Sequence, residues 1–117
     1  SANSITGSPV TYAGGGGGFA FPGSGGSGGS GGGGAGGGAN AAGADATNGT
    51  GGGGGGNSYG SGPPTQTGGL GGNGIVILRF LTANKPATLA IAPGTNTLST
   101  TGSDTLATFN VSGTLTL

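Results

Sequence analysis

The sequence predicts an all-β or irregular fold: a glycine-rich bundle of the polyglycine II type packed on a small antiparallel β-structure, with no helix. Three observations predict this fold. Glycine makes up 36 of the 117 residues, and every glycine except Gly7, Gly94, Gly102 and Gly113 lies between positions 14 and 74. Small residues recur there with a spacing of three, which suits a threefold extended strand. The final third of the chain is rich in threonine and alternates apolar with polar residues, as β-strands do.

We therefore expect two parts. Residues 1–82 would form a glycine-rich domain framed by short strands. Residues 83–117 would form a threonine-rich antiparallel segment that belongs to a larger sheet or to an intersubunit contact. A chain of 117 residues corresponds to one domain or to part of one. Because it starts at Ser1 without a methionine or a signal-like segment, we expect a processed product or a piece of a longer protein.

The opening residues 4–13 predict a short strand, a Gly-Ser-Pro turn and a second short strand. The glycine block that follows has two competing interpretations. Gly/Ser-rich chain normally behaves as a flexible linker; the alternative, which we favour, is an ordered array. Fixing the backbone costs roughly 1–2 kcal/mol per residue, and most positions have no side chain to offset it. Lateral main-chain hydrogen bonds, at roughly 0.5–1.5 kcal/mol each, are the remaining stabilising interaction.

Polyglycine II is an array of this kind, because each strand is a threefold extended helix without internal hydrogen bonds. The bare columns of the long run are Gly25, Gly28, Gly31, Gly34 and Gly37, and then Gly26, Gly29 and Gly32. The third column holds Ser24, Ser27 and Ser30, and its equivalent in the last run holds Thr67, Leu70 and Asn73. We expect bare columns to lie against other strands and the third column to meet solvent or the sheet, so that Gly31→Val disrupts the bundle. An irregular stack of glycine loops is the rival arrangement.

Two corners interrupt the glycine runs. Phe19 and Phe21, closed by Pro22, form the first corner. We favour rings that cap the bundle, because aromatic residues are scarce here and packing needs them; the alternative is an exposed pair that contacts a ligand. Asn57 and Tyr59 open the second corner, which is either a plain turn or a binding loop. The candidate surface-contact residues are thus Phe19, Phe21, Asn57 and Tyr59.

The strongest strand signal is residues 75–81, a continuous apolar run that predicts a strand buried on both faces. Further strands are predicted at 88–91, 97–101, 105–111 and 114–117. The last of these would leave an unpaired edge. We expect an intersubunit strand there, paired with a neighbouring chain or a missing segment and made of Thr114, Leu115, Thr116 and Leu117.

Composition argues against catalysis. The chain has no histidine and no cysteine, so the common metal-ligand sets and the Ser-His or Cys-His pairs are impossible. Asp45 and Asp104 are lone carboxylates, too few for calcium. With Arg79 and Lys85 they are the only charged residues and they sum to zero, so no basic patch predicts nucleic-acid binding. No apolar run is long enough to predict a membrane span. We expect a protein that is not an enzyme and needs no cofactor.

The motifs that flank the glycine runs carry a family resemblance. Residues 4–18 read Ser-Ile-Thr-Gly-Ser-Pro-Val-Thr-Tyr-Ala and five glycines, and residues 71–80 read Gly-Gly-Asn-Gly-Ile-Val-Ile-Leu-Arg-Phe. Over residues 4–81 this arrangement resembles the glycine-rich domain of phage tail-fibre and other virion-associated or surface proteins. Residues 104–117 loosely resemble the strand pair that adjoins such domains. The resemblance implies a polyglycine II-type, adhesin-like fibre element that is extracellular or part of a virion.

Three functional hypotheses follow. The first is a tail-fibre or adhesin domain whose partner is a cell-surface receptor such as a glycan or an outer-membrane protein. The second is the repeating subunit of an extracellular filament, a homo-oligomer assembled by strand donation. Closed symmetry favours the first and open head-to-tail contacts favour the second. The third is an ice-binding polyglycine II bundle, for which the Ser24, Ser27 and Ser30 column is too short to be favourable.

Overall fold

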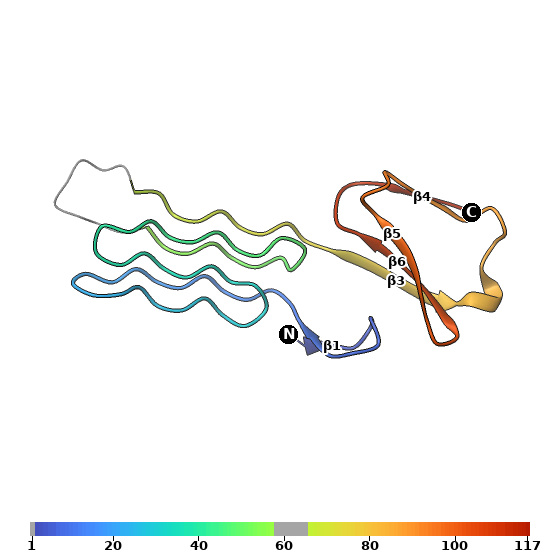
Figure 1. Cartoon of the computed structure of the whole chain (residues 1–117), viewed down its shortest axis with the longest axis horizontal. Helices are drawn as coiled ribbons and strands as arrows, with labels where there is room; N and C mark the ends of the chain where they lie inside the picture. The colour runs from blue at the N-terminus through green and yellow to red at the C-terminus, as the bar shows by residue number, and fades with distance from the viewer. Residues whose placement is uncertain (1, 58–65) are drawn as a thin grey trace. The chain divides into compact units, whose positions relative to one another are not determined.

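The structure is a computed structural model that describes residues 2–57 and 66–117. In chain order the elements are β1 (Ala2–Asn3), β2 (Val10–Thr11), β3 (Val76–Leu81), η1 (Thr82–Asn84), β4 (Ala90–Ala92), β5 (Thr97–Thr101), β6 (Asp104–Phe109) and β7 (Thr114–Thr116) (Figure 1). Within the described ranges the single helical element is η1, a short 3-10 turn. The all-β expectation with small antiparallel sheets and essentially no helix is therefore confirmed.

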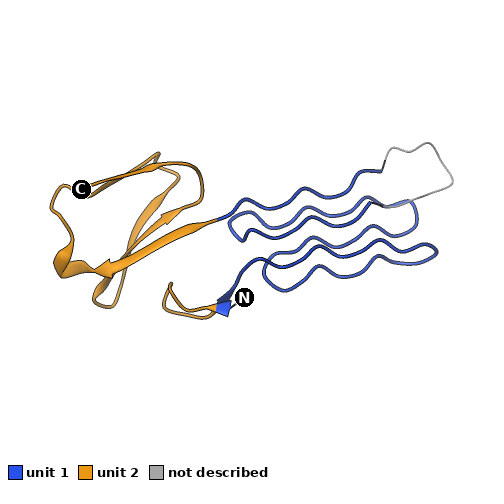
Figure 2. Ribbon diagram, turned by 180° about the vertical axis from the view of Figure 1, so that it is seen from behind, with its two compact units in different colours: residues 1–2, 10–74 blue, residues 3–9, 75–117 orange. Residues whose placement is uncertain are grey.

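The chain divides into two compact units (Figure 2). The glycine-rich unit contains residue 2 and residues 10–74, and the β unit contains residues 3–9 and 75–117. The division thus falls after Gly74 rather than after residue 82. The reason is that β3 pairs along its whole length with β6 of the β unit.

The glycine-rich unit consists of extended segments that run back and forth between two ends (Figure 1). We number them I (13–20), II (24–30), III (32–39), IV (42–48), V (51–57) and VI (66–74). None of them is assigned as a β-strand, because none pairs with a neighbour at every second residue. The predicted run 23–38 is therefore not one continuous strand: it turns at Ser30–Gly32 and is divided between segments II and III.

Hydrogen bonds between the segments repeat every three residues. Segment I donates from the amides of Gly14, Gly17 and Ala20, at 3.0, 2.8 and 3.2 Å, to the carbonyl oxygens of Gly31 in the turn before segment III and of Gly34 and Gly37 within it. Segment III donates in turn to segment V, and segment V donates back to segment I, each with the same spacing of three. This spacing is the property of a threefold strand, whose successive residues point in three directions.

The hydrogen bonds also define two layers. Segments II, III and IV bond side by side in one layer, and segments I, V and VI do so in the other. Further hydrogen bonds join the two layers. Their donor and acceptor segments are I to III, II to I, III to V, V to IV and IV to VI. Segments III and V therefore each bond to four neighbours, and a main-chain lattice takes the place of a side-chain core in this unit.

Steric contacts explain why the lattice requires glycine. An added Cβ at Gly17, Gly34 or Gly55 would overlap a carbonyl oxygen of a neighbouring segment. The same holds at Gly25 and Gly28, which confirms that bare columns lie against other strands. Gly31 differs from the prediction: it lies in the II–III turn with φ +101°, so the left-handed conformation and the nearby Tyr12 carbonyl oppose a side chain there.

The β unit contains the remaining sheets. β6 is the central strand of a three-stranded antiparallel sheet of order β3-β6-β5, and β4 pairs with β7 in a two-stranded sheet. The predicted strands at 88–91, 97–101, 105–111 and 114–117 correspond to β4, β5, β6 and β7. The prediction that residues 75–81 are buried on both faces was wrong. β3 lies at the sheet edge and leaves Val76 58% exposed, while the central strand β6 is buried.

The core of the β unit is small and centres on β6. Leu106, Ala107 and Thr105 are buried there, and Leu89, directly before β4, is buried as well. Residues 3–9 lie against the same sheet, since the guanidinium of Arg79 donates from Nη1 to the Ile5 carbonyl oxygen at 3.0 Å. The segment before β5 is fixed by the buried Asn96, whose Oδ1 accepts the amides of Asn110 and Val111.

The last strand has a partner inside the chain. β7 pairs antiparallel with β4, Ile91 opposite Leu115. One edge of residues 114–116 is therefore paired inside the chain, and pairing of this strand with a neighbouring chain or a missing segment stays a prediction for its other edge. Each strand of this pair has one strand neighbour among the described residues, so its outer edge remains open.

Candidate functional site at the loop end of the glycine-rich unit

The glycine-rich unit has two different ends. At one end the chain enters at Ala13 and leaves at Gly74, and tight turns join segments II to III and IV to V. At the other end lie the connections formed by residues 20–24 and residues 39–42, and segment V ends there at Asn57 (Figure 1). We call this second end the loop end. Protein binding sites commonly lie on loops that a rigid scaffold positions.

The bundle holds the bases of these loops in place. The Ala20 amide donates to the Gly37 carbonyl oxygen at 3.2 Å, and the Ala39 amide donates to that of Gly23 at 3.0 Å. The Gly37 amide donates to the Gly56 carbonyl oxygen at 3.0 Å. Each connection therefore starts from the last hydrogen bonds of the lattice, and the loops share one ordered platform.

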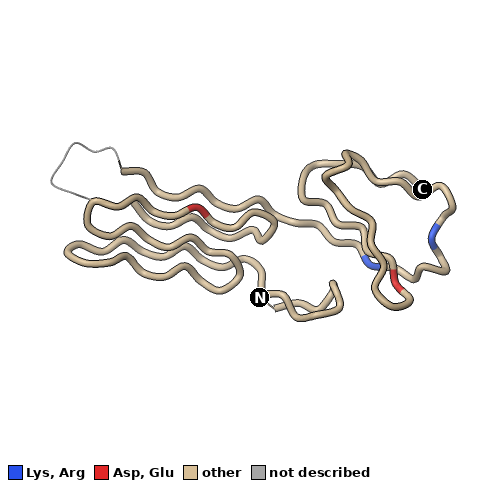
Figure 3. Tube along the Cα trace, in the orientation of Figure 1, with Lys and Arg blue, Asp and Glu red and all other residues tan. Residues whose placement is uncertain are grey.

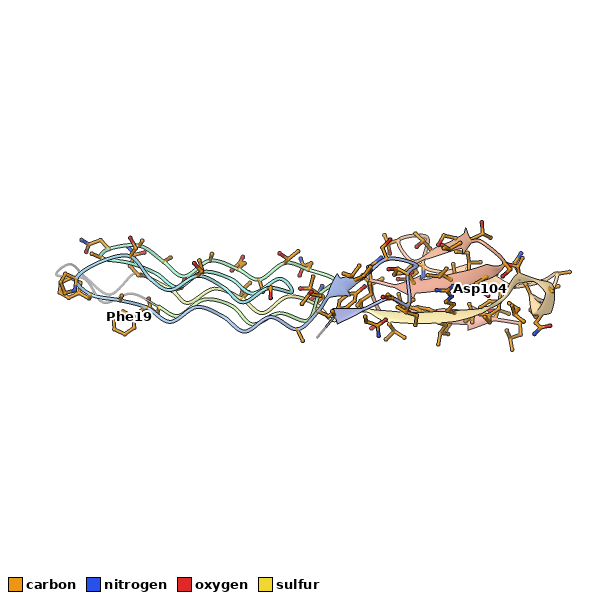
Figure 4. The ribbon with its side chains drawn as sticks, turned by 90° about the horizontal axis from the view of Figure 1, so that it is seen from below. Phe19 and Asp104 are labelled. Atoms are coloured by element: carbon orange, nitrogen blue, oxygen red, sulfur yellow. The ribbon has the colours of Figure 1, made fainter. Side chains whose placement is uncertain are left out.

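Two aromatic side chains stand on this platform. Phe19 is 52% exposed and Phe21 is 56% exposed, and Figure 4 shows the Phe19 ring projecting from the ribbon near the loop end. About half of the surface of each residue is therefore free for contact with another molecule, and whether the rings also cap the bundle stays a prediction. Free Phe side chains at a loop tip offer apolar contact area to another molecule.

The other predicted contact residues have different positions. Asn57 is exposed where segment V ends, and Asn40 is exposed in the neighbouring connection with φ +61°. A left-handed conformation at Asn40 is one that asparagine tolerates better than most residues. Tyr59 lies outside the described residues. The structure thus brings Phe19, Phe21 and Asn57 to one end of the unit.

The loop end carries no charge. Asp45 is the single charged residue of the glycine-rich unit, and it lies away from the loop end along segment IV (Figure 3). Arg79 and Asp104 form an ion pair within the β unit, with Nη2 2.6 Å and Nε 2.8 Å from Oδ2. Apolar contact and main-chain or amide hydrogen bonds are thus the interactions that Phe19, Phe21 and Asn57 can offer.

Asp45 and Asn48 have a structural role that was not predicted from the sequence. Asp45 Oδ1 accepts the Leu70 amide at 2.7 Å, and Asn48 Oδ1 accepts the Asn73 amide at 3.1 Å. The acceptors are three residues apart, and so are the donors. At this edge of the lattice the two side-chain oxygens accept the amides that the main-chain carbonyl oxygens of a further strand would otherwise accept. The spacing of three between Asp45 and Asn48 is visible in the sequence and could have revealed them.

The four residues predicted as an intersubunit strand lie on and beside β7. Leu117 is 75% exposed, directly after the β4–β7 pair. Over the part of the chain that the structure describes, no cluster of three or more metal-ligating side chains is present. Within the same ranges no helix combines the length and the apolar character needed to cross a bilayer.

Comparison with known proteins gives one match. A family model described as a glycine-rich domain matches residues 1–81. No curated protein and no solved structure matches the chain.

Proposed function

The chain belongs to the glycine-rich domain family, and on that premise we propose that it is a non-enzymatic structural and adhesive element of a fibre. The closest functional type is a phage tail-fibre-like domain that contributes to recognition of a host surface and acts outside the cell or on a virion. One observation carries the proposal: an ordered main-chain bundle holds two exposed aromatic residues, Phe19 and Phe21, at its loop end.

We assign the bundle itself to the polyglycine II type. The assignment is supported by hydrogen bonds that repeat every three residues, by strands with neighbours in several directions, and by glycine where neighbouring backbones touch. A bundle of this kind keeps its shape without a side-chain core. Its loops are therefore free to vary in sequence, because their side chains do not stabilise the scaffold.

The proposed partner is a cell-surface receptor, either a glycan or an outer-membrane protein. Exposed aromatic residues suit both, since a ring supplies a large apolar contact area with little loss of rotamer freedom on binding. The absence of charge at the loop end fits recognition by shape and apolar contact rather than by electrostatic steering.

Cell binding tests the proposal. Fluorescently labelled protein is incubated with a panel of bacterial strains, and cell-associated signal is measured for the parent chain and for Phe19→Ala with Phe21→Ala. We expect saturable binding to a subset of strains, and a loss of about 10-fold or more with the double variant, because buried aromatic anchors typically contribute over 1 kcal/mol each.

Leu70→Ala is the matched control, since Leu70 is also apolar and is 72% exposed but lies on segment VI away from the loop end. It should bind as the parent does. Equal binding by the parent and the Phe double variant, or no binding to any strain, contradicts the adhesive role. Purified outer-membrane proteins and surface polysaccharide, used as competitors, separate the two receptor classes.

A second candidate is the subunit of a filament assembled by strand addition. The observation that favours it is the open outer edge of the β4–β7 pair, beside the exposed Leu117. An added strand would supply the missing main-chain hydrogen bonds. Removal of residues 112–117 should then abolish filaments seen by electron microscopy, whereas unchanged assembly of the truncated chain excludes this candidate.

A further inference from the structure

One outer face of the glycine-rich unit is made almost entirely of main chain. It is the outer side of the layer formed by segments I, V and VI, and we call it the glycine face. Residues 14–18, residues 51–56 and most of residues 68–72 are glycine, and Leu70 is the exception. The opposite layer is different, because exposed side chains stand on it: Ser27, Ala35, Ala44 and Thr47.

The glycine face carries ordered rows of unpaired polar groups. In segment V the Gly53 and Gly56 amides donate to segment I and the Gly55 amide donates to segment IV, but the Gly54 amide and carbonyl have no hydrogen-bond partner among residues 2–57 and 66–117. A threefold strand sends every third residue in the same direction. The Gly54 amide direction is the one without a neighbouring segment, so this amide faces outward, while the Gly54 carbonyl oxygen lies beside Gly16 of segment I.

The flanking segments repeat this pattern. In segment I the Gly16 amide and carbonyl have no partner in the described part of the chain, and an added Cβ at Gly16 would overlap the Gly54 carbonyl oxygen, which places the two residues side by side. In segment VI the Gly69 and Gly72 amides donate to segment V, while the Gly71 amide has no partner within the described ranges.

The adjacent edge shows that unpaired rows are not left open everywhere. At the edge formed by segments IV and VI, Asp45 and Asn48 accept the amides of Leu70 and Asn73. These side chains close the lattice and place the unit's only negative charge there. Within residues 2–57 and 66–117 no side chain performs the same task for Gly16, Gly54 or Gly71.

We propose that the glycine face binds the glycine face of a second copy of this chain, so that the main-chain lattice continues across the interface. The face offers donors and acceptors in parallel rows, which is what a second face of the same kind needs. Residues 14–18, 51–56 and 68–72 carry no charge that would oppose the contact, and segments in the unit already hydrogen-bond in both parallel and antiparallel directions. Amides without a partner in the described ranges also occur in the opposite layer, at Ser27, Ala35 and Gly38, but exposed side chains stand on that layer. The combination of unpaired rows with the lack of covering side chains carries the inference.

Main-chain hydrogen bonds and Cα–H···O contacts between the two copies would stabilise this interface, in place of contacts between apolar side chains. Two backbones can approach in this way only where neither bears a Cβ, as at the axis of collagen. The side chains on segments II, III and IV prevent the same approach at the opposite layer. A closed, self-complementary pair is therefore expected, with two-fold symmetry. This inference does not depend on the proposed adhesive role, which concerns the loop end.

Sedimentation equilibrium of the full chain tests the pairing. The variant Gly18→Lys with Gly71→Lys places two charges on segments I and VI. An added Cβ meets no atom within 4 Å at Gly18 and lies 3.6 Å from the Gly52 carbonyl oxygen at Gly71, so the unit itself can accept them. The matched control is Ser27→Lys with Thr47→Lys, which adds the same charge to segments II and IV.

We expect a dimer for the parent and for the control, and a dissociation constant raised by about 100-fold or more for the glycine-face variant, because like charges would face each other across the contact. A parent chain that stays monomeric up to millimolar concentration overturns the inference. So does a dimer that survives in the glycine-face variant, which would place the contact elsewhere, for example at the open edge of β3.

Amide hydrogen exchange of the parent gives a readout that needs no substitution. The amides of Gly16, Gly54 and Gly71 should become protected as the concentration rises through the dissociation constant. Their neighbours Gly17, Gly55 and Gly72 already donate to carbonyl oxygens within the unit and should be protected at every concentration. Exchange of Gly16, Gly54 and Gly71 that does not change with concentration contradicts the proposal.

Discussion

Neighbouring glycines in segment I have very different surroundings, although the sequence gives them the same letter. An added Cβ at Gly17 would overlap the Gly26 carbonyl oxygen and lie 2.7 Å from the Gly36 amide nitrogen. At Gly18 nothing lies within 4 Å. The requirement for glycine is therefore set by the position of each residue in the threefold strand, and it recurs with the period of the hydrogen bonds.

The first prediction compares these two residues. Gly17→Ala should lower the free energy of unfolding by about 3 kcal/mol, because main-chain atoms of segments II and III must move to admit the methyl group. Gly18→Ala should be neutral or stabilising by about 0.5 kcal/mol, since it restricts the unfolded chain without a clash. Chemical denaturation of both variants measures the difference, and equal stabilities would contradict the steric account.

The second prediction concerns Ala13, which has φ +58° where segment I begins. A non-glycine residue in this conformation is strained by roughly 1–2 kcal/mol. Ala13→Gly should raise the free energy of unfolding by about 0.5–1 kcal/mol, because the relief of strain exceeds the larger conformational entropy that glycine loses on folding.

Gly51→Ala is the reverse control. At Gly51 φ is +67° and the nearest atom to an added Cβ is 3.9 Å away, so the left-handed conformation alone should lower the free energy of unfolding by about 1 kcal/mol. Thermal melts that rank these variants the other way would refute the strain.

Single segments are stabilised by different numbers of neighbours. Segments III and V have four each, whereas segment VI has two and relies on side-chain acceptors along its outer row. Segment VI is consequently where the lattice depends most on individual polar groups, because removing one leaves an amide without its acceptor.

The third prediction tests this dependence. Asp45→Ala removes the acceptor of the Leu70 amide and should lower the free energy of unfolding by about 1–2 kcal/mol, with faster exchange of that amide. Asp45→Asn keeps an acceptor oxygen at the same position and should retain most of the stability. If the two variants are equally destabilised, then the charge matters rather than the acceptor.

Elements built from side-chain patterns were predicted well from the sequence, and those built from glycine only in part. Alternating threonine and apolar residues predicted β5, β6 and β7 close to their observed bounds. The threefold spacing predicted bare columns against other strands. The turn at Gly31 was not predicted, because glycine is equally suited to the strand and to the positive φ of the turn, so the sequence contains no signal that separates them.

Predictions of burial depended on information that lies outside each segment. The apolar run 75–81 predicted a buried strand, yet β3 has a neighbour on one side only, and strand order is a property of the whole sheet. Exposure of Phe19 and Phe21 could be predicted only as one of two alternatives, for a related reason. Phe residues are usually buried in a side-chain core, and the sequence alone does not show whether such a core lies beneath them.

The whole chain should unfold with an unusual heat capacity. Unfolding exposes apolar surface, which raises the heat capacity, and peptide groups, which lower it. The glycine-rich unit buries mostly peptide groups. The fourth prediction is a heat-capacity change clearly below the ordinary value for 117 residues, which is about 1.4–1.8 kcal/mol/K. Differential scanning calorimetry measures it, and a value within the ordinary range would indicate an apolar core that the described residues do not contain.

Amide hydrogen exchange of the dilute native chain tests the central claim most directly, namely that lateral main-chain hydrogen bonds with a period of three hold the glycine-rich unit together. In segment I the account predicts slow exchange at every third residue, with protected amides at Gly14 and Gly17 and fast exchange at Gly15 and Gly18. In segment V it predicts two protected amides of every three, with Gly53, Gly55 and Gly56 protected and Gly54 fast. Uniformly fast exchange throughout both segments, or protection in segment I that alternates at every second residue, would contradict it.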